Sequence, residues 1–430
     1  MKRLLLAAIL AGFGSADAQT IAQRVARAPD GEVRLQFAPR PGTCGDGRDV
    51  IGYGKAIFAG SVQSFGDWDA PNCVAGAMRV SLSVENGQVT RIQSFVSGAW
   101  SRTGGRVTDL GTVSSGDAAT YFFELVPRLE NRTNRARILL PAVLAADDRT
   151  VARLVALARD ASRAEDTRRE ALQWIGLLGD ASVIPTLVDF ARRAPGDGDL
   201  DDSQGPGHEG LANAALAALS FLENGIGVPA LIDLARTGAP RVRQSAVFWL
   251  AQSGDPRAFA MLHTVIENSR EDERVRANAI FSLAHGGDVP PREYAYLREL
   301  FPRLSSARLK ESVIHAVAQD ETAGSPWLLQ KGRDASESMK IRKAAIFWAG
   351  QRDATPTRDL VSFYQSVRES ELKEHTIFVL SQRDDEPALN ELLRIAKDDA
   401  DRRMRARALF WLGQNDDPRV ENLIGERLAR

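Results

Sequence analysis

The sequence has 430 residues, with 55 lysines and arginines, 56 aspartates and glutamates, and a formal net charge of −1. This balance argues against a protein built to bind nucleic acid, because phosphate binding depends on clustered, excess basic side chains. Hydrophobic residues make up 44% of the chain and charged residues 26%, which is typical of a folded protein rather than a disordered one. Two cysteines and five histidines supply few ligands for a structural zinc site.

The first 18 residues have the composition of a signal peptide. Lys2 and Arg3 precede an apolar run that ends near Gly14, and Ala16-Asp17-Ala18 fits a small-x-small cleavage site. The run is about 11 residues long, and a membrane-spanning helix needs about 20. A short buried helix is the alternative. We expect cleavage after Ala18 and a periplasmic or secreted protein with no membrane-spanning segment.

Both cysteines, Cys44 and Cys73, lie in the N-terminal region. Export would place them in an oxidising compartment, where paired cysteines form disulfides. A bridge would close a loop of about 30 residues, which the chain-entropy model values at roughly 3–4 kcal/mol. Two buried free thiols are the alternative, and the spacing is not that of a redox-active Cys-x-x-Cys motif. We predict a Cys44–Cys73 disulfide.

Residues 19–115 are predicted to form a small antiparallel β domain. Apolar residues alternate with polar ones along 32–37 and 78–84, and a further strand is predicted at 88–96. Asn86-Gly87 lies between the last two strands and favours a tight hairpin, because both residues tolerate positive φ. The domain has no histidine, and therefore no Ser–His or Cys–His pair. A linking helix is predicted within 116–137, with its apolar face at 117–129.

A repeated pattern fills residues 138–430. Three stretches, 243–252, 342–351 and 405–414, share one order of residue types. A basic residue is followed by two variable residues, a small residue, an aliphatic residue, Phe, Trp, two small or apolar residues, and Gln. The small residue recurs at Ala171, Ala215, Ala246, Ala279, Ser312, Ala345, Thr376 and Ala408, at intervals of 31 to 33 residues apart from one of 44. A ninth, degenerate copy begins near Leu139. Each unit is predicted to be a motif helix, a Gly/Asp/Pro turn and a second amphipathic helix.

Two helices of about a dozen residues cannot bury their apolar faces alone, so the units are expected to stack around a continuous core. The small residue would allow helices of neighbouring units to approach closely. The Phe and Trp that follow it are predicted to fill the space between layers as core side chains. A ligand-binding surface is the alternative for the tryptophans.

These stretches resemble HEAT repeats, in particular the short bacterial repeats similar to those of phycobilisome lyases. The resemblance rests on the Arg-x-x-Ala-aliphatic-x-[Trp/aliphatic]-Leu-Gly stretches and the Gly-Asp turns, and covers about 290 residues, from near 139 to 430. It implies an all-α solenoid of about nine repeats with a right-handed superhelix, preceded by the disulfide-stapled β domain. The β domain would cover the apolar end of the first unit. Such arrays serve many roles, so the fold alone does not define the function.

Basic and acidic residues also recur once in each unit. The basic residues that open the motif helices are Arg168, Arg243, Arg276, Arg342, Lys373 and Arg405, and the turn acids are Asp180, Asp255, Asp288, Asp353, Asp384 and Asp416. The HEAT resemblance implies that the two sets join in a ladder across neighbouring units, and we predict a structural role for them. A basic stripe for an acidic partner is the alternative, which the near-zero net charge disfavours.

An insertion at 195–209 accounts for the 44-residue interval. Asp197, Asp199 and Asp201 have the 1, 3, 5 spacing of a calcium loop. Position 6 is Asp202 rather than glycine and position 12 is His208 rather than glutamate, so an acidic surface loop is favoured over a calcium site. His208-Glu209 is the only His-Glu pair, whereas HEAT-repeat di-iron hydroxylases carry several on helices.

The sequence contains no G-x-S-x-G, P-loop or H-E-x-x-H motif, and we predict no catalytic, cofactor-binding or metal-ligating residues. The histidines of the array are assigned to repeat positions, with His315 at the Trp position and His285 at the Gln position. We expect a monomeric scaffold that binds a protein or peptide on the concave face of the solenoid, formed by the second helices. The alternative is a HEAT-like lyase or other modifying enzyme acting on a protein-bound substrate.

Overall fold

The computed structural model describes residues 19–54, 56–59, 62–65, 72–100, 105–129, 138–193, 210–286, 289–414, 417–421 and 423. The signal-peptide and acidic-loop hypotheses fall outside these ranges, as do Asp288 and Asp416. The chain divides into two compact units, Met1–Leu187 and Val188–Arg430. Within the described ranges, no helix is both long and apolar enough to cross a membrane.

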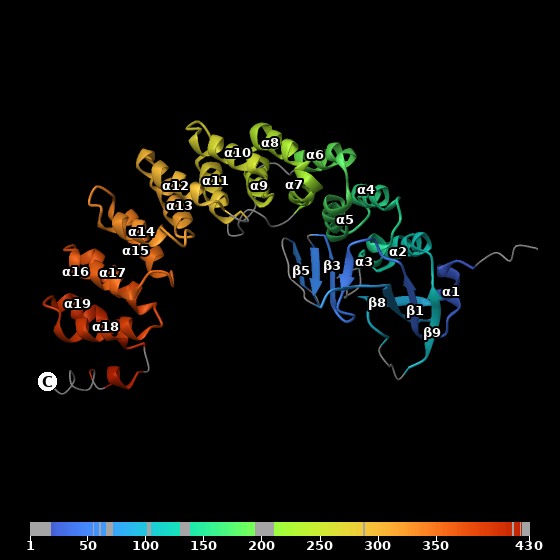
Figure 1. Ribbon diagram of the computed structural model, residues 1–430, viewed down its shortest axis with the longest axis horizontal. Helices are drawn as coiled ribbons and strands as arrows, with labels where there is room; N and C mark the ends of the chain where they lie inside the picture. Colours follow the sequence, from blue (N-terminus) through green and yellow to red (C-terminus); the bar gives the residue numbers. More distant parts are fainter. Residues whose placement is uncertain are drawn as a thin grey trace, which may run out of the picture. The chain divides into compact units, whose positions relative to one another are not determined.

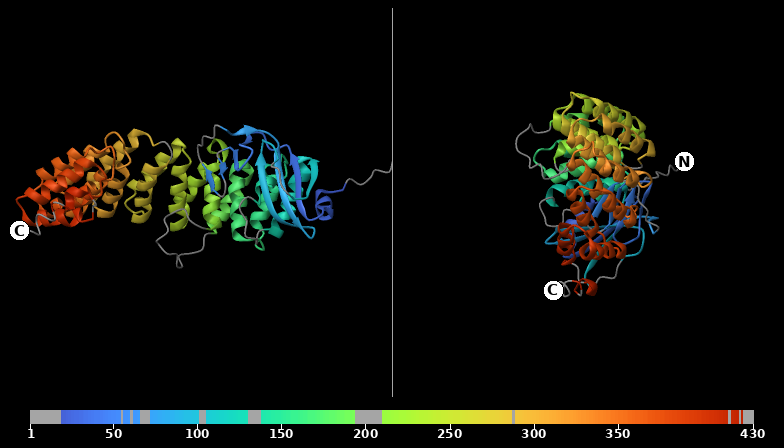
Figure 2. Two further views of the ribbon diagram at one scale, coloured as in Figure 1. Left: turned by 90° about the horizontal axis from the view of Figure 1, so that it is seen from below. Right: turned by 90° about the vertical axis from the view of Figure 1, so that its left-hand side faces the viewer.

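Two β-sheets follow a short helix, α1 (Ile21–Arg27), in the first unit (Figures 1 and 2). The first sheet has the order β8–β7–β1–β9, from β1 (Gly31–Phe37), β7 (Met78–Glu85), β8 (Gln88–Val96) and β9 (Val107–Thr112). The second has the order β5–β4–β3–β2–β6, from β2 (Thr43–Gly45), β3 (Val50–Tyr53), β4 (Ala56–Ala59), β5 (Val62–Phe65) and β6 (Val74–Ala75). Among the described strands, every pair is antiparallel except β1 and β9. The predicted antiparallel sheets are confirmed, with that one parallel pair added.

The predicted alternation and hairpin both occur in the first sheet. Val33, Leu35 and Phe37 of β1 are fully buried, and each lies opposite an apolar residue of β7. Asn86 and Gly87 have φ of 52° and 70°, the left-handed backbone that a tight turn between β7 and β8 requires.

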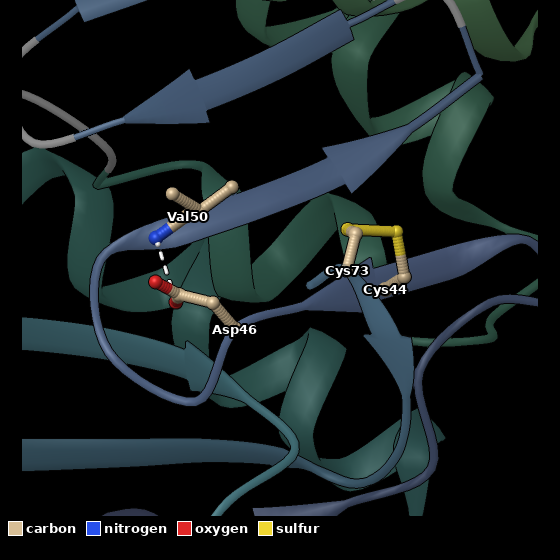
Figure 3. Close-up of a disulfide and its surroundings, with 4 residues drawn as sticks. All are labelled: Cys44, Asp46, Val50 and Cys73. Carbon is tan, nitrogen blue, oxygen red and sulfur yellow. Dashed lines mark hydrogen bonds between the residues drawn. A yellow bond between two sulfur atoms is a disulfide. The ribbon is translucent and has the colours of Figure 1, made fainter. Parts of the chain in front are cut away.

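The predicted disulfide is present and joins the second sheet at its β2–β6 side (Figure 3). Cys44 lies in β2, and Cys73 directly precedes β6. Nearby, the Asp46 carboxylate accepts hydrogen bonds from the amides of Arg48 (2.8 Å) and Val50 (3.0 Å), which closes the turn into β3. Burial opposes the charge on Asp46, but these amide donors hold its pKa below the usual value.

The sheets and the first helices of the chain share a core. The helices of this unit are α2 (Ser115–Leu129), α3 (Leu140–Leu144), α4 (Thr150–Arg159) and α5 (Glu165–Leu178), followed by α6 (Ile184–Arg192) at the junction of the two units. Trp174 of α5 is 1% exposed because Phe58 of β4 stacks on it at 5.4 Å between ring centroids and Tyr53 of β3 lies at 6.5 Å. Phe37 of β1 meets Phe122 of α2 at 6.1 Å. Strand side chains therefore cover α5, the first helix that carries the Arg-x-x-Ala-x-x-Trp pattern.

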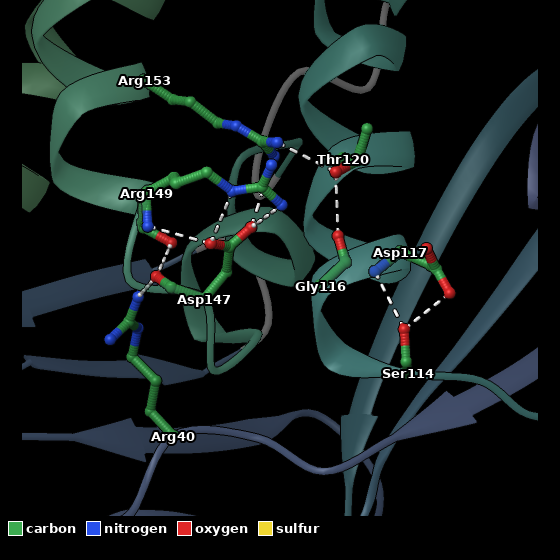
Figure 4. A network of polar contacts seen from close by, with 9 residues as sticks. Arg40, Ser114, Gly116, Asp117, Thr120, Asp147, Arg149 and Arg153 are labelled. Atoms are coloured by element: carbon green, nitrogen blue, oxygen red, sulfur yellow. Dashed lines mark hydrogen bonds and ion pairs between the residues drawn. The ribbon is translucent and has the colours of Figure 1, made fainter.

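A polar network makes a second connection between the β region and these helices (Figure 4). Arg40 follows β1 and donates to the backbone carbonyls of Val143 (2.8 Å) and Asp147 (2.7 Å). The Asp147 carboxylate pairs with Arg149 and lies 3.7 Å from Arg153, which also donates to Thr120 of α2 (2.9 Å). The network holds the chain after β1 against α2, α3 and α4.

The Arg40→Ala substitution should lower the free energy of unfolding by about 2–3 kcal/mol, because two carbonyls lose a charged donor. Urea unfolding of the intact chain measures the change. Arg48→Ala is the control, since Arg48 is exposed, and it should alter stability by less than about 0.5 kcal/mol. Equal effects of the two substitutions would show that the network does not join the sheets to the helices.

The second unit is an array of paired helices, as predicted. After α7 (Leu211–Phe221), six helices carry the repeated motif: α9 (Pro240–Gln252), α11 (Glu273–His285), α13 (Ala307–Val317), α15 (Met339–Gly350), α17 (Ser370–Ser381) and α19 (Arg402–Leu412). We call these the motif helices. The partner helices are α8 (Val228–Thr237), α10 (Pro256–Glu267), α12 (Pro291–Leu300), α14 (Gly324–Arg333), α16 (Thr357–Ser366) and α18 (Glu386–Asp398). Each partner helix packs more extensively on the motif helix that follows it than on the one before it, so the predicted pairing is wrong by one helix.

The motif helices line the inner side of the curved second unit (Figure 1). They pack on one another from pair to pair, whereas successive partner helices make less contact. The small residues permit this close approach, since Ala246, Ala279, Ala345, Thr376 and Ala408 are all fully buried. The prediction that the second helices form the concave face is therefore wrong.

The register of α13 also differs from the prediction. Val313 is fully buried and takes the place of the small residue, whereas Ser312 is partly exposed. The sequence suggested Ser312 because it is small, but burial follows the position on the helix. With Val313 as reference, Lys310 becomes the basic residue of this unit and His315 takes the Phe position rather than the Trp position.

A ladder of basic and acidic residues does join neighbouring pairs, but with other acids than those predicted. Arg243 donates to Glu271, Lys310 to Glu337 and Arg342 to Glu369, at 2.7–2.8 Å, and each glutamate precedes the next motif helix. Arg168, Arg276 and Arg405 instead donate to the backbone carbonyls of Ala158, Ile266 and Asp399. Lys373 lies over the ring of Tyr364.

The turn acids have a local role. The Asp180 and Asp255 carboxylates accept from the amides of Ser182 and Arg257 and cap the helices that follow. A side chain committed to its own helix end does not reach the next unit. Asp353 and Asp384 make no ion pair within the described residues.

Arg342→Met should lower the free energy of unfolding by about 1–3 kcal/mol. Arg342 is 6% exposed, and without it the Glu369 carboxylate and the Gly332 carbonyl each lose a hydrogen-bond donor. Arg358→Met, which removes an 84% exposed side chain, is the control and should be nearly neutral. Thermal unfolding measures both.

The Arg342–Glu369 pair also predicts that the stability of the chain depends on pH. A backbone amide and the Arg342 guanidinium lower the pKa of Glu369. Its stabilisation is therefore fully present above the ordinary glutamate pKa of about 4.3 and is lost as the pH falls through the lowered value. Glu369→Gln should make unfolding less sensitive to pH in that acidic range. An unchanged pH profile would contradict this role.

Candidate functional site

Aromatic rings lie in a row on the concave side of the motif helices, and ring contacts connect the row from α11 to α19. The Phe position holds Phe248, Phe281, His315, Phe347, Phe378 and Phe410, and the Trp position holds Trp249, Trp348 and Trp411. We call these nine residues the aromatic row. Rings of neighbouring helices stack, with centroids 5.6 Å apart for Phe281 and His315 and 6.4 Å apart for Phe347 and Phe378. Trp348 meets His315 at 4.3 Å and Trp411 meets Phe378 at 5.1 Å.

The aromatic row lies at the surface, so the prediction that its Phe and Trp residues are core side chains is wrong. Trp249, Trp348 and Trp411 are partly exposed, and Phe410 is 57% exposed. The core is filled instead by the aliphatic residues one and four positions after the small residue. They include Val247, Leu250, Ile280, Leu283, Ile346, Ile377 and Leu380, all fully buried. The Phe and Trp positions fall on the remaining, concave face of the same helices.

A cleft of about 360 Å³ opens in the aromatic row between α11, α13 and α15. Its lining residues are Phe281, Arg308, Glu311, Ser312, His315, Ala344 and Trp348. Three of them are rings of the row, and the polar ones come from a single helix, α13. The cleft can therefore take up an apolar side chain against the rings and a polar group against α13.

The polar groups of the cleft do not form a nucleophile–base pair. The Ser312 hydroxyl donates to the backbone carbonyl of Arg308 at 3.1 Å, and Glu311 pairs with Lys340 at 2.7 Å. Within the described residues, no three His, Cys, Asp or Glu side chains are placed to hold a metal ion.

Two histidines stack within the row. The rings of His285 and His315 are 5.1 Å apart, and His285 Nδ1 is 2.8 Å from the Phe281 carbonyl. Burial lowers the pKa of His315, and the neighbouring His285 lowers it further because two imidazolium charges would repel. His315 is thus held neutral, which suits a ring that packs against Trp348.

Charged and amide side chains border the aromatic row. Five residues of the first turns of motif helices share one position, and we call them the basic edge: Arg241, Arg274, Arg308, Lys340 and Arg403. Glu371 takes the same position on α17. At the opposite ends of the helices, Gln252, Gln319, Gln351, Gln382 and Gln414 are all exposed. The concave face is therefore basic along one side and neutral and polar along the other.

The spacing of the aromatic and glutamine positions in the sequence is itself a signal for this surface. Phe248 and Gln252, like Phe347 and Gln351, are four residues apart and so share a helix face. A face that repeats an exposed type of residue such as glutamine is a surface face, and the aromatic residue on it is then at the surface as well.

Comparisons with known proteins agree with the helical fold. Residues 228–318 match the family model of HEAT repeats, and the helical array is a HEAT-repeat solenoid. No curated protein matches the sequence. Similar solved structures include human deoxyhypusine hydroxylase in complex with glycerol, with 18% identity over 57% of this chain and 89% of that one and a TM-score of 0.27. The CpcE–CpcF complex of phycocyanin lyase from Nostoc sp. PCC7120 has 16% identity over 56% of this chain and 91% of that one, with a TM-score of 0.27. Lipovitellin has 12% identity over 92% of this chain and 45% of that one, with a TM-score of 0.45. Similarity at this level assigns no activity to the chain.

An NMR titration of the histidines checks the electrostatics of the row. His315 should titrate below about 6.5, so the folded chain should lose stability as the pH falls through that value, because the unfolded chain takes up the proton first. His285→Gln removes the neighbouring charge and should raise the pKa of His315. His375 on α17 is the internal control and should not respond to that substitution. A His315 midpoint that stays constant or falls would contradict the coupling.

Proposed function

We propose that the chain is an exported HEAT-repeat scaffold that binds a segment of a protein partner along the aromatic row. The observation that carries the proposal is the unbroken series of ring contacts from α11 to α19 on the concave side, among side chains that are at least partly exposed. Aromatic side chains dominate binding hot spots, because they bury a large area on contact and lose little conformational entropy. A repeat array suits this role, since it extends one surface over many units.

Export and the monomeric state are parts of the same proposal. Export rests on the composition of residues 1–18, with cleavage after Ala18, and agrees with the Cys44–Cys73 disulfide. A modifying enzyme related to the lyases rests on resemblance alone. The hydrogen bonds of Ser312 and Glu311 give that alternative no activated group in the cleft.

Selection from a displayed library of random 12-residue peptides tests the proposal. Peptides that bind the mature chain should bind Trp348→Ala at least tenfold more weakly, because Trp348 forms a wall of the cleft. Trp327→Ala is the matched control, since Trp327 is also partly exposed but lies on a partner helix, α14, against Phe301. The two variants can be compared by fluorescence anisotropy once circular dichroism shows both to be folded.

The proposal fails if no peptide is enriched, or if Trp327→Ala and Trp348→Ala weaken binding equally. Binding that depends on Trp348 alone places the ligand on the concave side of the array.

A further inference from the structure

The conformation and chemistry of the bound segment can be derived from the spacing of the aromatic row and the charges beside it. We infer that the concave face takes an extended segment with two residues per helix pair, apolar side chains on the aromatic row and acidic side chains on the basic edge. This inference rests on the proposed function and specifies its ligand.

The step from one motif helix to the next is close to the repeat of an extended chain at two places. Stacked rings of neighbouring helices are 5.6 Å apart for Phe281 and His315 and 6.4 Å apart for Phe347 and Phe378. Two residues of a β-strand advance about 6.4–6.8 Å. At these two steps, the spacing of the rings is close to that of alternate side chains in an extended segment.

The distance between the basic edge and the aromatic row also suits an extended chain. The basic edge and the Phe position are seven residues apart on each motif helix, about 10.5 Å along its axis. Successive side chains of a strand point to opposite sides of its backbone, and layers packed through such side chains lie about 10 Å apart. A strand in the groove thus reaches both sides at once. An α-helix is about 10–12 Å wide with its side chains and presents a single face, which fits the 360 Å³ cleft poorly.

The first unit already contains strands that pack on a Trp position of the repeated pattern. Trp174 of α5 has the Trp position of the motif, and it is buried because strand residues lie over it. Phe58 of β4 stacks on it at 5.4 Å, and Tyr53 of the adjacent β3 lies at 6.5 Å. In the first unit, a strand with an aromatic side chain therefore covers the Trp position at Trp174. The same position is partly exposed at Trp348 in the second unit.

The basic edge supplies charge at the surface. Four of its five side chains are exposed, with 61% for Arg274, 71% for Lys340 and 69% for Arg403, whereas Arg241 is partly exposed. The present partners of Arg274, Lys340 and Arg403 are Asp272, Glu311 and Glu374. Asp272 and Glu311 are 45% and 30% exposed, and pairs at the surface contribute about 0–1 kcal/mol, so carboxylates of a ligand can compete for Arg274 and Lys340. Glu374 is 13% exposed and also pairs with Arg407. Within the described residues Arg308, which lines the cleft, has no acidic partner.

Three synthetic 12-residue probes test the inference on the intact mature chain by fluorescence anisotropy. The first alternates Glu and Val, the second has the same composition in the order Glu-Glu-Val-Val, and the third alternates Lys and Val. The first should bind at least tenfold more tightly than either of the others, and the difference from the Lys–Val probe should shrink as salt is added. The second probe breaks the two-residue period at constant charge, and the third reverses the charge at constant period.

Substitutions on the basic edge complete the test. Arg308→Gln combined with Lys340→Gln should weaken the Glu–Val probe at least fivefold, and Arg308→Glu with Lys340→Glu should shift the preference toward the Lys–Val probe. Arg358→Gln, on the partner helix α16, is the control and should leave all three affinities unchanged. The inference is overturned if the alternating Glu–Val probe does not bind. It is also overturned if the Glu-Glu-Val-Val probe or the Lys–Val probe binds as tightly as the alternating Glu–Val probe.

The library selection separates this outcome from failure of the proposed function. If selected peptides depend on Trp348 but lack the two-residue period or the acids, the scaffold function stands and the extended acidic ligand does not. If no selected peptide depends on Trp348, both are wrong.

Discussion

The close approach of successive motif helices is the constraint on which the array depends. Small residues at one position of every motif helix except α13, such as Ala279 and Ala345, are fully buried where neighbouring helices meet. Gly350 of α15 has the same role, because an added Cβ would collide with Val379 of α17. Since the motif helices approach more closely than the partner helices, the unit curves toward them (Figure 1). The concave face is thus a consequence of side-chain size.

The same constraint brings the aromatic row together. Helices that approach closely carry their surface side chains toward one another, and the rings at the Phe position stack between neighbours such as Phe347 and Phe378. A stacked ring covers part of its neighbour and leaves one face to solvent. The row therefore keeps a defined geometry without a ligand and retains apolar area for one. Binding to such a preformed surface has a small ordering cost.

The sequence predicted those parts of the structure that local pattern determines. Strand alternation around Leu35, the Asn86-Gly87 turn, the Cys44–Cys73 bridge and the helical repeat are confirmed. Periodicity shows that residues share a helix face, but not whether that face meets another helix or solvent. For this reason Trp348 was assigned to the core, and the order of helix pairing was wrong by one helix. The ladder partners were missed because Glu369 lies in a loop, where sequence spacing does not report distance.

Trp174 and Trp348 show why the exposure of a repeat position has to be read from its surroundings. Both occupy the Trp position of the repeated pattern, although α5 has Gln173 at the Phe position and Leu177 at the Gln position. Trp174 is 1% exposed because Phe58 stacks on it, whereas Trp348 borders an open cleft. At the start of the helical series the chain supplies its own covering strand, as the end of a repeat array requires. In the second unit the same aromatic position is partly exposed at Trp348, which is where we propose that a segment of another molecule binds.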